Sequence, residues 1–459
     1  MLNPHIFREY DIRGVADRDL TEETAFAVAR AFGSRVREDG GRTVVLGRDV
    51  RASSPRLEET WTRGLISTGL SVLRTGMVPT PAVYYAVAAW PADAGVMITG
   101  SHNPIEFNGF KLQLGPASLH GEEIQDLRRR IEAGIFVEGI GEVVDRPVLE
   151  AYGAMIVERC RPVRPLRLVI DAGNGTAGPV AVPILEALGH TVTPLFCDPD
   201  PRFPNHLPDP TVPAFMKELA RRVVEEGADL GFGYDGDADR LGVIDETGRL
   251  LYGDQLLALF ARDVLERVPG APIVFDVKCS QGLEEDIRAH GGRPVMWKSG
   301  HSLTKAKMRE EGAPLAGEMS GHMFFAEGFW GHDDGIYGSA RLAAILARWG
   351  GPLSRHVADL PHYENSPEIR VECPDEAKFR VVQELAEEFA RTHEVLTLDG
   401  ARVRFEDGWG LVRASNTQPV LVLRFEGRTR AALRTVETAF RTALARHPEV
   451  RMSEGGETD

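Results

Sequence analysis

The run TVVLGRD at residues 43–49 decides the fold, because the chain repeats its pattern twice more. A short apolar, β-branched run ends in an aspartate, small or polar residues follow, and a helical stretch comes next. The other two copies are LVID at 168–171 and IVFD at 273–276. A buried strand that feeds a helix in this way is typical of α/β domains, and the even placement of the copies predicts three successive domains of that class.

The last part of the chain has a different order of elements. After residue 367, short strands are interrupted by one amphipathic helix and followed by another. This order predicts a smaller α+β domain. We therefore expect three similar α/β domains with mixed sheets at residues 1–150, 151–252 and 253–366, and an α+β domain at residues 367–459.

The composition is that of an ordinary soluble protein. The 459 residues exceed what one hydrophobic core usually supports, which agrees with several domains. The chain is 43% hydrophobic and 26% charged, as globular domains are. Its net charge of −15 argues against a nucleic-acid binder, which would need a basic face.

The spacing of the cysteines and the lack of long apolar runs indicate where in the cell the protein is expected. The four cysteines are far apart and form no CxxC pair, so we expect free thiols in a reducing cytoplasm and no zinc site. The N-terminal residues lack the apolar segment of a signal peptide. No apolar run reaches the roughly 18 residues that span a membrane. We therefore expect a cytoplasmic protein that binds no membrane.

The run TGSHNP at residues 99–104 places a serine on a turn. Gly100 and Pro104 favour the turn and disfavour a helix through it. The hydroxyl of Ser101 is a weak nucleophile unless a base or a metal assists it. Taken alone, the run would be a polar turn.

The run DGDADR at residues 235–240 packs three carboxylates into five residues. The preceding residues 229–234 predict a strand that ends at this run, at the sheet edge where α/β proteins place ligands. A divalent ion with oxygen ligands relieves the repulsion between such carboxylates. An EF-hand loop needs a glycine where Arg240 stands, and helical flanks, so we expect Mg²⁺ and not Ca²⁺. Arg240 itself suits bidentate contact with phosphate oxygens.

Two further loops offer polar groups for a sugar phosphate. GEMSGH at 317–322 provides a carboxylate, a hydroxyl and an imidazole, which suit vicinal sugar hydroxyls. RASNTQP at 413–419 provides a guanidinium, hydroxyls, an amide and backbone N–H groups, which suit a phosphate that does not react. Each loop is a weak signal by itself.

Together these runs resemble the α-D-phosphohexomutase family. The stretch TGSHNPIEFNGFK at 99–111 is similar to the active-site loop of the family nearly residue for residue, and the other three loops match in order. The form GEMSGH is similar to the phosphomannomutase/phosphoglucomutase branch. Phe107, Leu207 and Gln418 depart from the usual residues of the family. The resemblance covers nearly the whole chain and implies four domains around a central cleft.

The resemblance also implies roles for particular residues. Ser101 would carry the phosphoryl group, and Lys111 would act as a general acid/base or contact a phosphate. Ser101, through its phosphate, and three aspartates would bind Mg²⁺: Asp235, Asp237 and Asp239. Glu318 and Ser320 would contact the sugar hydroxyls O3 and O4. The spare phosphate would lie against Arg413, Ser415, Asn416 and Thr417. The remaining cleft residues would be Tyr10, Arg13, Lys278, Lys298, His301 and His322, with Arg13, His301 and His322 as candidates for proton transfer.

The function implied is reversible transfer of a phosphoryl group between the 1- and 6-positions of a hexose phosphate, of mannose, glucose or both. It would run through a phosphoserine and a bisphosphorylated sugar, with glucose 1,6-bisphosphate as activator and with closure of the fourth domain. Phosphoglucosamine mutase and a metal-dependent sugar phosphatase remain alternatives, as does a regulatory protein in which Ser101 only carries phosphate. The expected partners are small sugar phosphates, for a monomer or a dimer.

Overall fold

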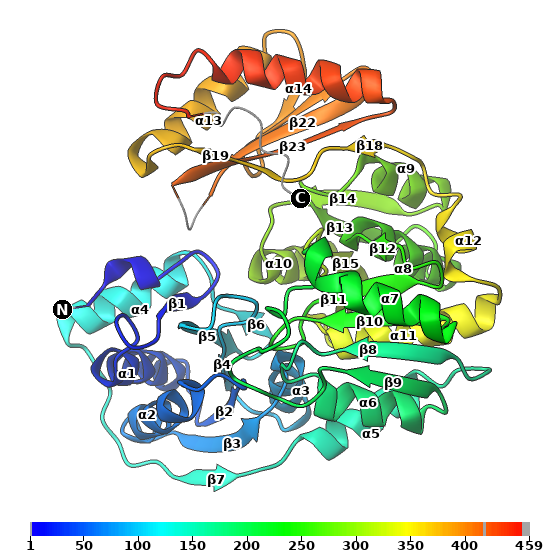
Figure 1. Cartoon of the computed structure of the whole chain (residues 1–459). Coiled ribbons are helices and arrows are strands. Elements are labelled where there is room, and N and C mark those ends of the chain that lie inside the picture. Colours follow the sequence, from blue (N-terminus) through cyan, green and yellow to red (C-terminus); the bar gives the residue numbers. More distant parts are fainter. Residues whose placement is uncertain (1, 416–418, 452–459) are drawn as a thin grey trace.

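Four sheets follow one another along the chain, each with its own helices (Figure 1). The computed structural model describes residues 2–415 and 419–451. None of the helices in these ranges is both long and apolar enough to cross a membrane. Two short 3₁₀ helices, η1 (Pro4–Ile6) and η2 (Pro213–Met216), lie outside the sheets.

The first sheet is mixed and has seven strands. They are β1 (Ile12–Val15), β2 (Thr43–Arg48), β3 (Ser71–Met77), β4 (Ala94–Ile98), β5 (Phe107–Leu114), β6 (Ala117–Ser118) and β7 (Val143–Asp145). Their order is β1-β5-β4-β2-β3-β7, with β6 on β5. Strand β2 is parallel to β3 and β4, whereas β5 is antiparallel to β4 and β1. The helices are α1 (Glu22–Glu38), α2 (Ser54–Ile66), α3 (Thr80–Ala89) and α4 (Glu122–Ala133).

The second sheet is mixed and has five strands. They are β8 (Arg167–Asp171), β9 (Thr191–Leu195), β10 (Leu230–Tyr234), β11 (Leu241–Asp245) and β12 (Leu250–Leu251), in the order β12-β11-β10-β8-β9. Strands β8, β9 and β10 are parallel, and β11 and β12 form an antiparallel hairpin. The helices are α5 (Leu149–Arg159), α6 (Gly178–Ala187) and α7 (Lys217–Glu226).

The third sheet also has five strands and mixed directions. They are β13 (Pro272–Asp276), β14 (Arg293–Trp297), β15 (Leu315–Gly317), β16 (Met323–Phe325) and β17 (His332–Asp333), in the order β14-β13-β15-β16-β17. Strand β13 is parallel to β14 and β15, and β16 is antiparallel to β15 and β17. The helices are α8 (Gly253–Arg267), α9 (Gln281–Ala289), α10 (His301–Glu311), α11 (Gly335–Trp349) and α12 (Leu353–Val357).

The fourth sheet has six strands, and every pair is antiparallel. The strands are β18 (Glu364–Asn365), β19 (Ile369–Glu372), β20 (Glu394–Leu396), β21 (Ala401–Phe405), β22 (Gly408–Ala414) and β23 (Val420–Gly427). The helices are α13 (Asp375–Phe389) and α14 (Arg430–Leu444). The predicted fold class, three mixed α/β units and one α+β unit, is thereby confirmed.

The repeated aspartates end or directly follow the first buried strand of each α/β unit. Asp49 follows β2, and Asp171 and Asp276 end β8 and β13. Each is almost fully buried and accepts a hydrogen bond from the turn after its strand: from Arg51 N at 3.0 Å, from Gly173 N at 2.8 Å and from Cys279 Sγ at 3.0 Å. The aspartate of the repeat therefore fixes the turn that follows the strand.

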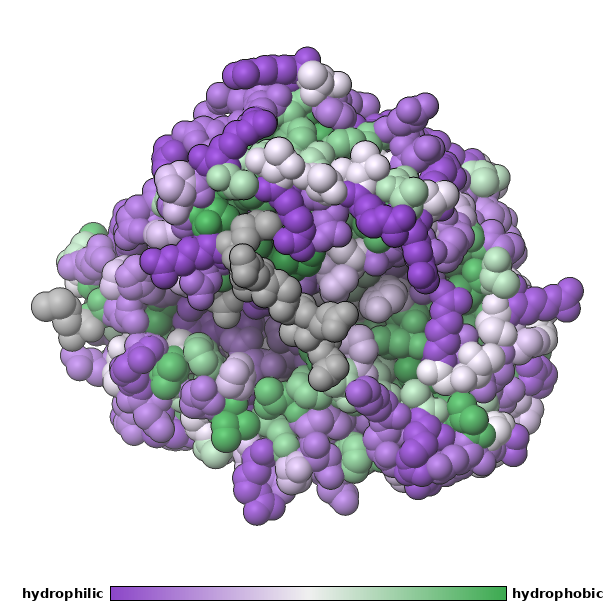
Figure 2. All heavy atoms as spheres, turned by 45° about the horizontal axis from the view of Figure 1, so that its top comes forward, coloured by the Kyte–Doolittle hydropathy of each residue, from purple (hydrophilic) through white to green (hydrophobic). Residues whose placement is uncertain are grey.

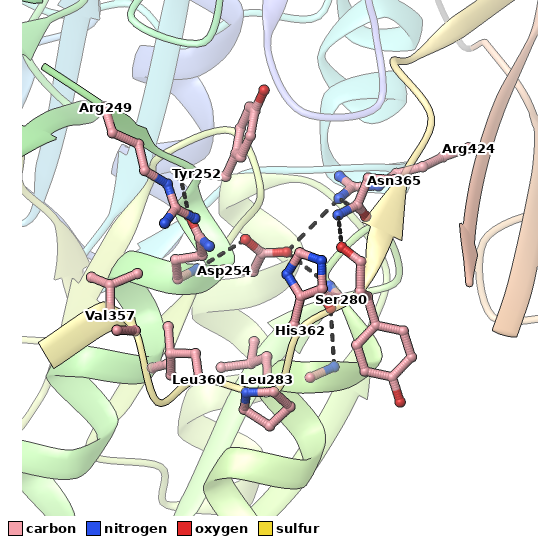
Figure 3. A pocket seen from close by; sticks show the side chains of 16 residues that line it. Arg249, Tyr252, Asp254, Ser280, Leu283, Val357, Leu360, His362, Asn365 and Arg424 are labelled. Atoms are coloured by element: carbon pink, nitrogen blue, oxygen red, sulfur yellow. Dashed lines mark hydrogen bonds and ion pairs between the residues drawn. The ribbon is translucent and has the colours of Figure 1, made fainter. Parts of the chain in front are cut away.

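The fourth unit is joined less closely than the other three. One continuous hydrophobic cluster runs through the first three units, whereas the fourth has a cluster of its own. A small cluster of Val277, Trp409 and Leu411 links the third and fourth units. A polar contact at a nearby pocket also bridges them (Figure 3): Arg424 on β23 lies 3.9 Å from Asp254 on α8, and within the fourth sheet it donates to Asn365 Oδ1 at 3.3 Å.

Candidate active site

A cleft between the four units brings most of the predicted site residues together. Two adjoining cavities, of about 480 and 760 Å³, share Arg240, Lys278 and Ser320 in their walls. The smaller is also lined by Tyr10 from the first unit and Arg413 from the fourth. The face shown in Figure 2 is hollowed near its centre, and both hydrophilic and hydrophobic side chains stand at the rim of the hollow.

Ser101 lies on the turn between β4 and β5 and is buried beside this cleft, whose smaller cavity is lined by the next two residues of the chain. Its backbone takes the left-handed region at φ 49°, which L-residues adopt only at a cost. The Ser101 N–H donates to Thr99 Oγ1 at 2.8 Å, and the hydroxyl donates to Asp235 Oδ2 at 2.6 Å. His102 Nδ1 lies 3.1 Å from the same hydroxyl. The serine therefore faces the acidic loop directly.

The three aspartates of the loop after β10 converge. Asp235, Asp237 and Asp239 are fully buried, and they offer carboxylate oxygens within 4.8 Å of one another. Lys111 on β5 donates to Asp237 Oδ2 at 2.7 Å and also to Asp239. The ammonium of Lys111 therefore neutralises part of the acidic cluster.

The pKa values of the cluster diverge. Burial, reinforced by the charges of Asp237 and Asp239, raises the pKa of Asp235 well above its ordinary value. Burial would also raise the pKa of Asp237, but the Lys111 charge and hydrogen bonds outweigh it and lower that pKa. For Lys111, attraction to these two aspartates outweighs burial and raises the pKa. Lys111 is therefore charged at neutral pH.

The cluster is suited to a hard divalent cation. Among the described residues, no hydrogen-bond partner reaches Asp237 Oδ1 or Asp239 Oδ1, although both atoms are buried. Oxygens of this kind, with no other partner, are the ligands that Mg²⁺ and similar ions prefer. The donor set therefore fits a metal site at this loop.

His322 is held in a defined orientation. Arg240 Nε donates to His322 Nε2 at 3.1 Å, so the ring proton of the neutral imidazole belongs on Nδ1. Nδ1 lies 2.9 Å from Asp333 Oδ2, and Lys305 donates to the other oxygen of that carboxylate at 3.1 Å. Asp333 thus stands behind His322, on the side away from Arg240.

His301, at the start of α10, is differently placed. Neither of its ring nitrogens has a hydrogen-bond partner among the described residues, and its side chain lines the smaller cavity. Burial, with the nearby charge of Lys305, lowers the pKa of His301 well below its ordinary value. The imidazole is therefore neutral near pH 7.

The carboxylate of Glu318 is fixed by three donors. Its Oε1 accepts from Gly300 N at 3.0 Å and from Thr304 Oγ1 at 2.7 Å, and its Oε2 accepts from Ser320 Oγ at 3.1 Å. Both Glu318 and Ser320 line the smaller cavity. The loop thus presents an oriented carboxylate and hydroxyl to the cleft.

The fourth unit contributes Arg413 and Ser415 to the same cavity. Arg413 pairs with Asp399 at 2.9 Å, and Asp399 also accepts from Ser299 N at 3.2 Å. This link joins the third unit to the fourth. The predicted residues Asn416 and Thr417, and Gln418 beside them, lie outside the described residues.

The remaining predicted residues fall into two groups. Arg13 on β1 donates to Asn103 Oδ1 at 3.1 Å, and Lys278 lies 3.6 Å from Asp276 Oδ2; both face the cleft with Tyr10. Lys298 is exposed and lines neither of the two cavities. The structure therefore does not bring Lys298 to the others.

Several residues of the site have no signal in the sequence. Thr80 donates to Asp237, and Lys305 and Asp333 support His322 from distant elements. Only His102 was within reach of sequence reasoning, because it lies inside the motif of Ser101. Contacts between residues far apart in the chain depend on the fold and not on local spacing.

The chain matches known protein families along most of its length. Four models of phosphoglucomutase/phosphomannomutase domains match in order: α/β/α domain I at residues 4–138, domain II at 150–248, domain III at 252–363 and the C-terminal domain at 368–443. The chain belongs to the phosphoglucomutase/phosphomannomutase family. The matches include most strands of all four sheets and each of the four loops of the cleft.

Individual members of the phosphoglucomutase/phosphomannomutase family are similar over nearly their whole length. A phosphomannomutase/phosphoglucomutase of Pseudomonas aeruginosa is 48% identical over 96% of this chain and 95% of its own. A phosphoglucomutase of Neisseria gonorrhoeae is 44% identical over 97% of this chain and 98% of its own. The crystal structure of a family protein from Burkholderia thailandensis has a TM-score of 0.93 at 43% identity, over 98% of this chain and all of the other.

Proposed function

We propose that this protein is a phosphohexomutase that moves a phosphoryl group between the 1- and 6-positions of hexose phosphates. The observation that carries the proposal is the hydrogen bond of 2.6 Å from the Ser101 hydroxyl to Asp235, inside a buried cluster of three carboxylates beside the cleft. Relatives at 44–48% identity bear the names of such enzymes. Mannose and glucose phosphates are therefore the proposed substrates.

The proposed reaction consists of two phosphoryl transfers, and in each of them one P–O bond forms and one breaks. A sugar hydroxyl attacks the phosphorus of phosphorylated Ser101, so that a new P–O bond forms and the bond to Ser101 Oγ breaks. The hydroxyl proton passes to a base. The bisphosphate then turns, and Ser101 Oγ attacks its other phosphorus. A new P–O bond to the serine forms and the bond from that phosphorus to the sugar oxygen breaks, while the serine hydroxyl loses its proton and the sugar oxygen gains one. Such a transfer depends mainly on positioning and on stabilisation of charge.

The acidic loop is the proposed metal site. Asp235, Asp237 and Asp239 would hold Mg²⁺ together with the phosphoryl group on Ser101. When bound, the ion supplies positive charge to the transferring phosphoryl oxygens. Arg240, whose guanidinium lines both cavities, would contact phosphate oxygens at the same place.

Two side chains are proposed to handle the proton. His301 is neutral and its nitrogens are not engaged by described residues, so it can accept a proton from a sugar hydroxyl. Lys111 is a charged donor beside the acidic loop and can stabilise or protonate the departing serine oxygen. Arg13 and His322 face the same space and complete the set of candidates.

The rest of the cleft is proposed to bind the substrate. Glu318 and Ser320 would read two vicinal sugar hydroxyls, with Tyr10 and Lys278 along the wall. Arg413 and Ser415, with Asn416 and Thr417, would hold the phosphate that does not react. Because the fourth unit has its own hydrophobic core and shares a small hydrophobic cluster with the third, hinge closure over the substrate is the proposed motion. Lys298 has no assigned contact and stays a prediction.

A coupled assay tests the proposal. Glucose 1-phosphate or mannose 1-phosphate is supplied with Mg²⁺ and a trace of glucose 1,6-bisphosphate, the proposed activator, and formation of 6-phosphate and of free phosphate are followed together. The proposal predicts rapid 6-phosphate formation with little free phosphate. Free phosphate as the main product would support a phosphatase instead. Turnover only with glucosamine 1-phosphate would move the substrate to that sugar.

A further inference from the structure

Arg51 has a fully buried guanidinium whose donors are directed at the turn that carries Ser101. The residue follows β2 and is 1% exposed. Its Nη1 donates to the carbonyl oxygens of Pro104 at 2.6 Å and Phe107 at 2.9 Å, and its Nη2 donates to those of Ser101 at 2.8 Å and Asn103 at 2.5 Å. One side chain thus satisfies four backbone acceptors within seven residues.

Asp49 completes the contact from the same loop. Its carboxylate lies 3.3 Å from Arg51 Nε and accepts the N–H of Gly100 at 3.0 Å. Asp49 also accepts the Arg51 N–H at 3.0 Å, which ties the arginine to its own strand. The Arg51–Asp49 pair therefore binds both the N–H groups and the carbonyls of the serine turn.

The fit between Arg51 and this turn is close. A Cβ atom on Gly100 would lie 2.4 Å from Arg51 Cζ and Nε, so the backbone of the turn rests directly on the guanidinium. On the opposite side, a Cβ atom on Gly236 would lie 2.5 Å from Ser101 O. The Ser101 carbonyl is therefore packed between Arg51 and the acidic loop.

The turn needs an outside support to keep this shape. Ser101 adopts φ 49°, a conformation that a serine populates rarely and that persists only where the surroundings impose it. Four carbonyls of the turn face the buried guanidinium, and a carbonyl that turns away from solvent needs a donor. A planar guanidinium is the side chain that offers several donors in a fixed geometry, whereas an ammonium is a point charge.

We propose that Arg51 is a positioning residue for phosphoryl transfer: it holds the turn so that Ser101 Oγ faces the acidic loop. Arg51 does not itself line the cleft, and its hydrogen bonds go to backbone carbonyls and not to the hydroxyl of Ser101, so it acts through the backbone. The inference rests on the proposed role of Ser101. Arg51 comes from a different loop than the other site residues, and it determines whether Ser101 is correctly placed.

Two variants disturb the contact from opposite sides. Arg51→Lys keeps a cation beside Asp49 but cannot span four carbonyls. Gly100→Ala keeps Arg51 and inserts a methyl group into the guanidinium, at a residue whose own φ does not require glycine. The matched control is Arg48→Lys, because Arg48 pairs with Glu58 at 2.9 Å and donates nothing to the turn.

The experiment measures kcat, KM and the phosphorylation of Ser101 in the full-length protein with Mg²⁺. Both variants should lower kcat by about 100-fold, as expected for a displacement of roughly 1 Å, with KM for glucose 1-phosphate changed less than about threefold. Intact-protein mass spectrometry after incubation with glucose 1,6-bisphosphate should show slowed phosphorylation in both. The Arg48→Lys control should match the unmodified protein.

A double variant separates positioning from general damage. If the two changes disrupt one contact, Arg51→Lys combined with Gly100→Ala should cost little more than either alone. Full kcat and normal phosphorylation in folded Arg51→Lys would overturn the inference, as would multiplicative losses in the double variant. Absence of mutase activity in the unmodified protein would instead refute the proposed function.

Discussion

Replacing Lys111 by methionine should make the stability of the protein depend strongly on Mg²⁺. The ammonium of Lys111 is buried and donates to Asp237 at 2.7 Å and to Asp239. Its loss leaves the buried carboxylates of Asp237 and Asp239 without their only lysine partner among the described residues. A divalent ion bound by the same carboxylates would replace the missing charge.

The magnitude follows from the cost of breaking a buried ion pair, about 3–5 kcal/mol. We expect the lower end, about 3 kcal/mol, because Asp235 has a raised pKa and can take up a proton to offset part of the charge. For a domain of ordinary size this corresponds to a fall in melting temperature of roughly 10 °C in EDTA. Mg²⁺ at about 100 times its dissociation constant should return about 2.7 kcal/mol.

Thermal melts with EDTA and with saturating Mg²⁺ test this prediction. Lys111→Met should gain clearly more from Mg²⁺ than the unmodified protein does. Lys217→Met is the matched control, because Lys217 is exposed at the start of α7 and, among the described residues, forms no ion pair with the aspartates of the acidic loop. An equal loss for Lys111→Met with and without Mg²⁺ would refute the reasoning, as would no loss in EDTA.

Three further predictions concern other residues. Burial raises the pKa of Asp334 to about 7 from an ordinary value of 3.8. The contribution of Asp334 to stability is therefore full below about pH 4 and is lost as the pH rises through about 7. Asp334→Asn should flatten this dependence of stability on pH in thermal melts between about pH 5 and 8, and an unchanged slope would contradict the prediction. Asp333→Asn should lower kcat by about tenfold or more and alter the pH profile of kcat, because Asp333 orients His322. A loss of stability with normal kinetics would show that Asp333 has a structural role only. Glu318→Gln should raise KM for hexose phosphates about tenfold or more, because the oriented carboxylate is lost. Ser101 should still be phosphorylated by glucose 1,6-bisphosphate, because the transfer site is unchanged. An unchanged KM would show that Glu318 does not contact the sugar.

The sequence predicts the loops of the site because each carries its chemistry in a short run. The turn of Ser101 and the acidic loop follow buried strands, and the apolar runs before them mark where those strands end. The α+β character of the last unit was likewise visible as alternation. Strands β7 and β20, which are short and mostly exposed, lack such alternation and have no comparable signal.

The supports of these loops could not be predicted in the same way. Arg51 follows a strand like many surface arginines, and only the fold shows that it is buried beneath the serine turn. Lys305 looks like a solvent-facing residue of an amphipathic helix, yet it is buried against Asp333. Their partners lie tens of residues away, so local spacing contains no information on the contact.

The central claim is that Ser101 carries the phosphoryl group that reaches the sugar. The most direct test is to label the protein with radioactive phosphate from glucose 1,6-bisphosphate, locate the label by peptide mapping, and chase with unlabelled glucose 1-phosphate. We predict label on Ser101 that moves into glucose bisphosphate and glucose 6-phosphate, and no labelling of Ser101→Ala. Label on another residue, or its release as inorganic phosphate alone, would contradict the claim.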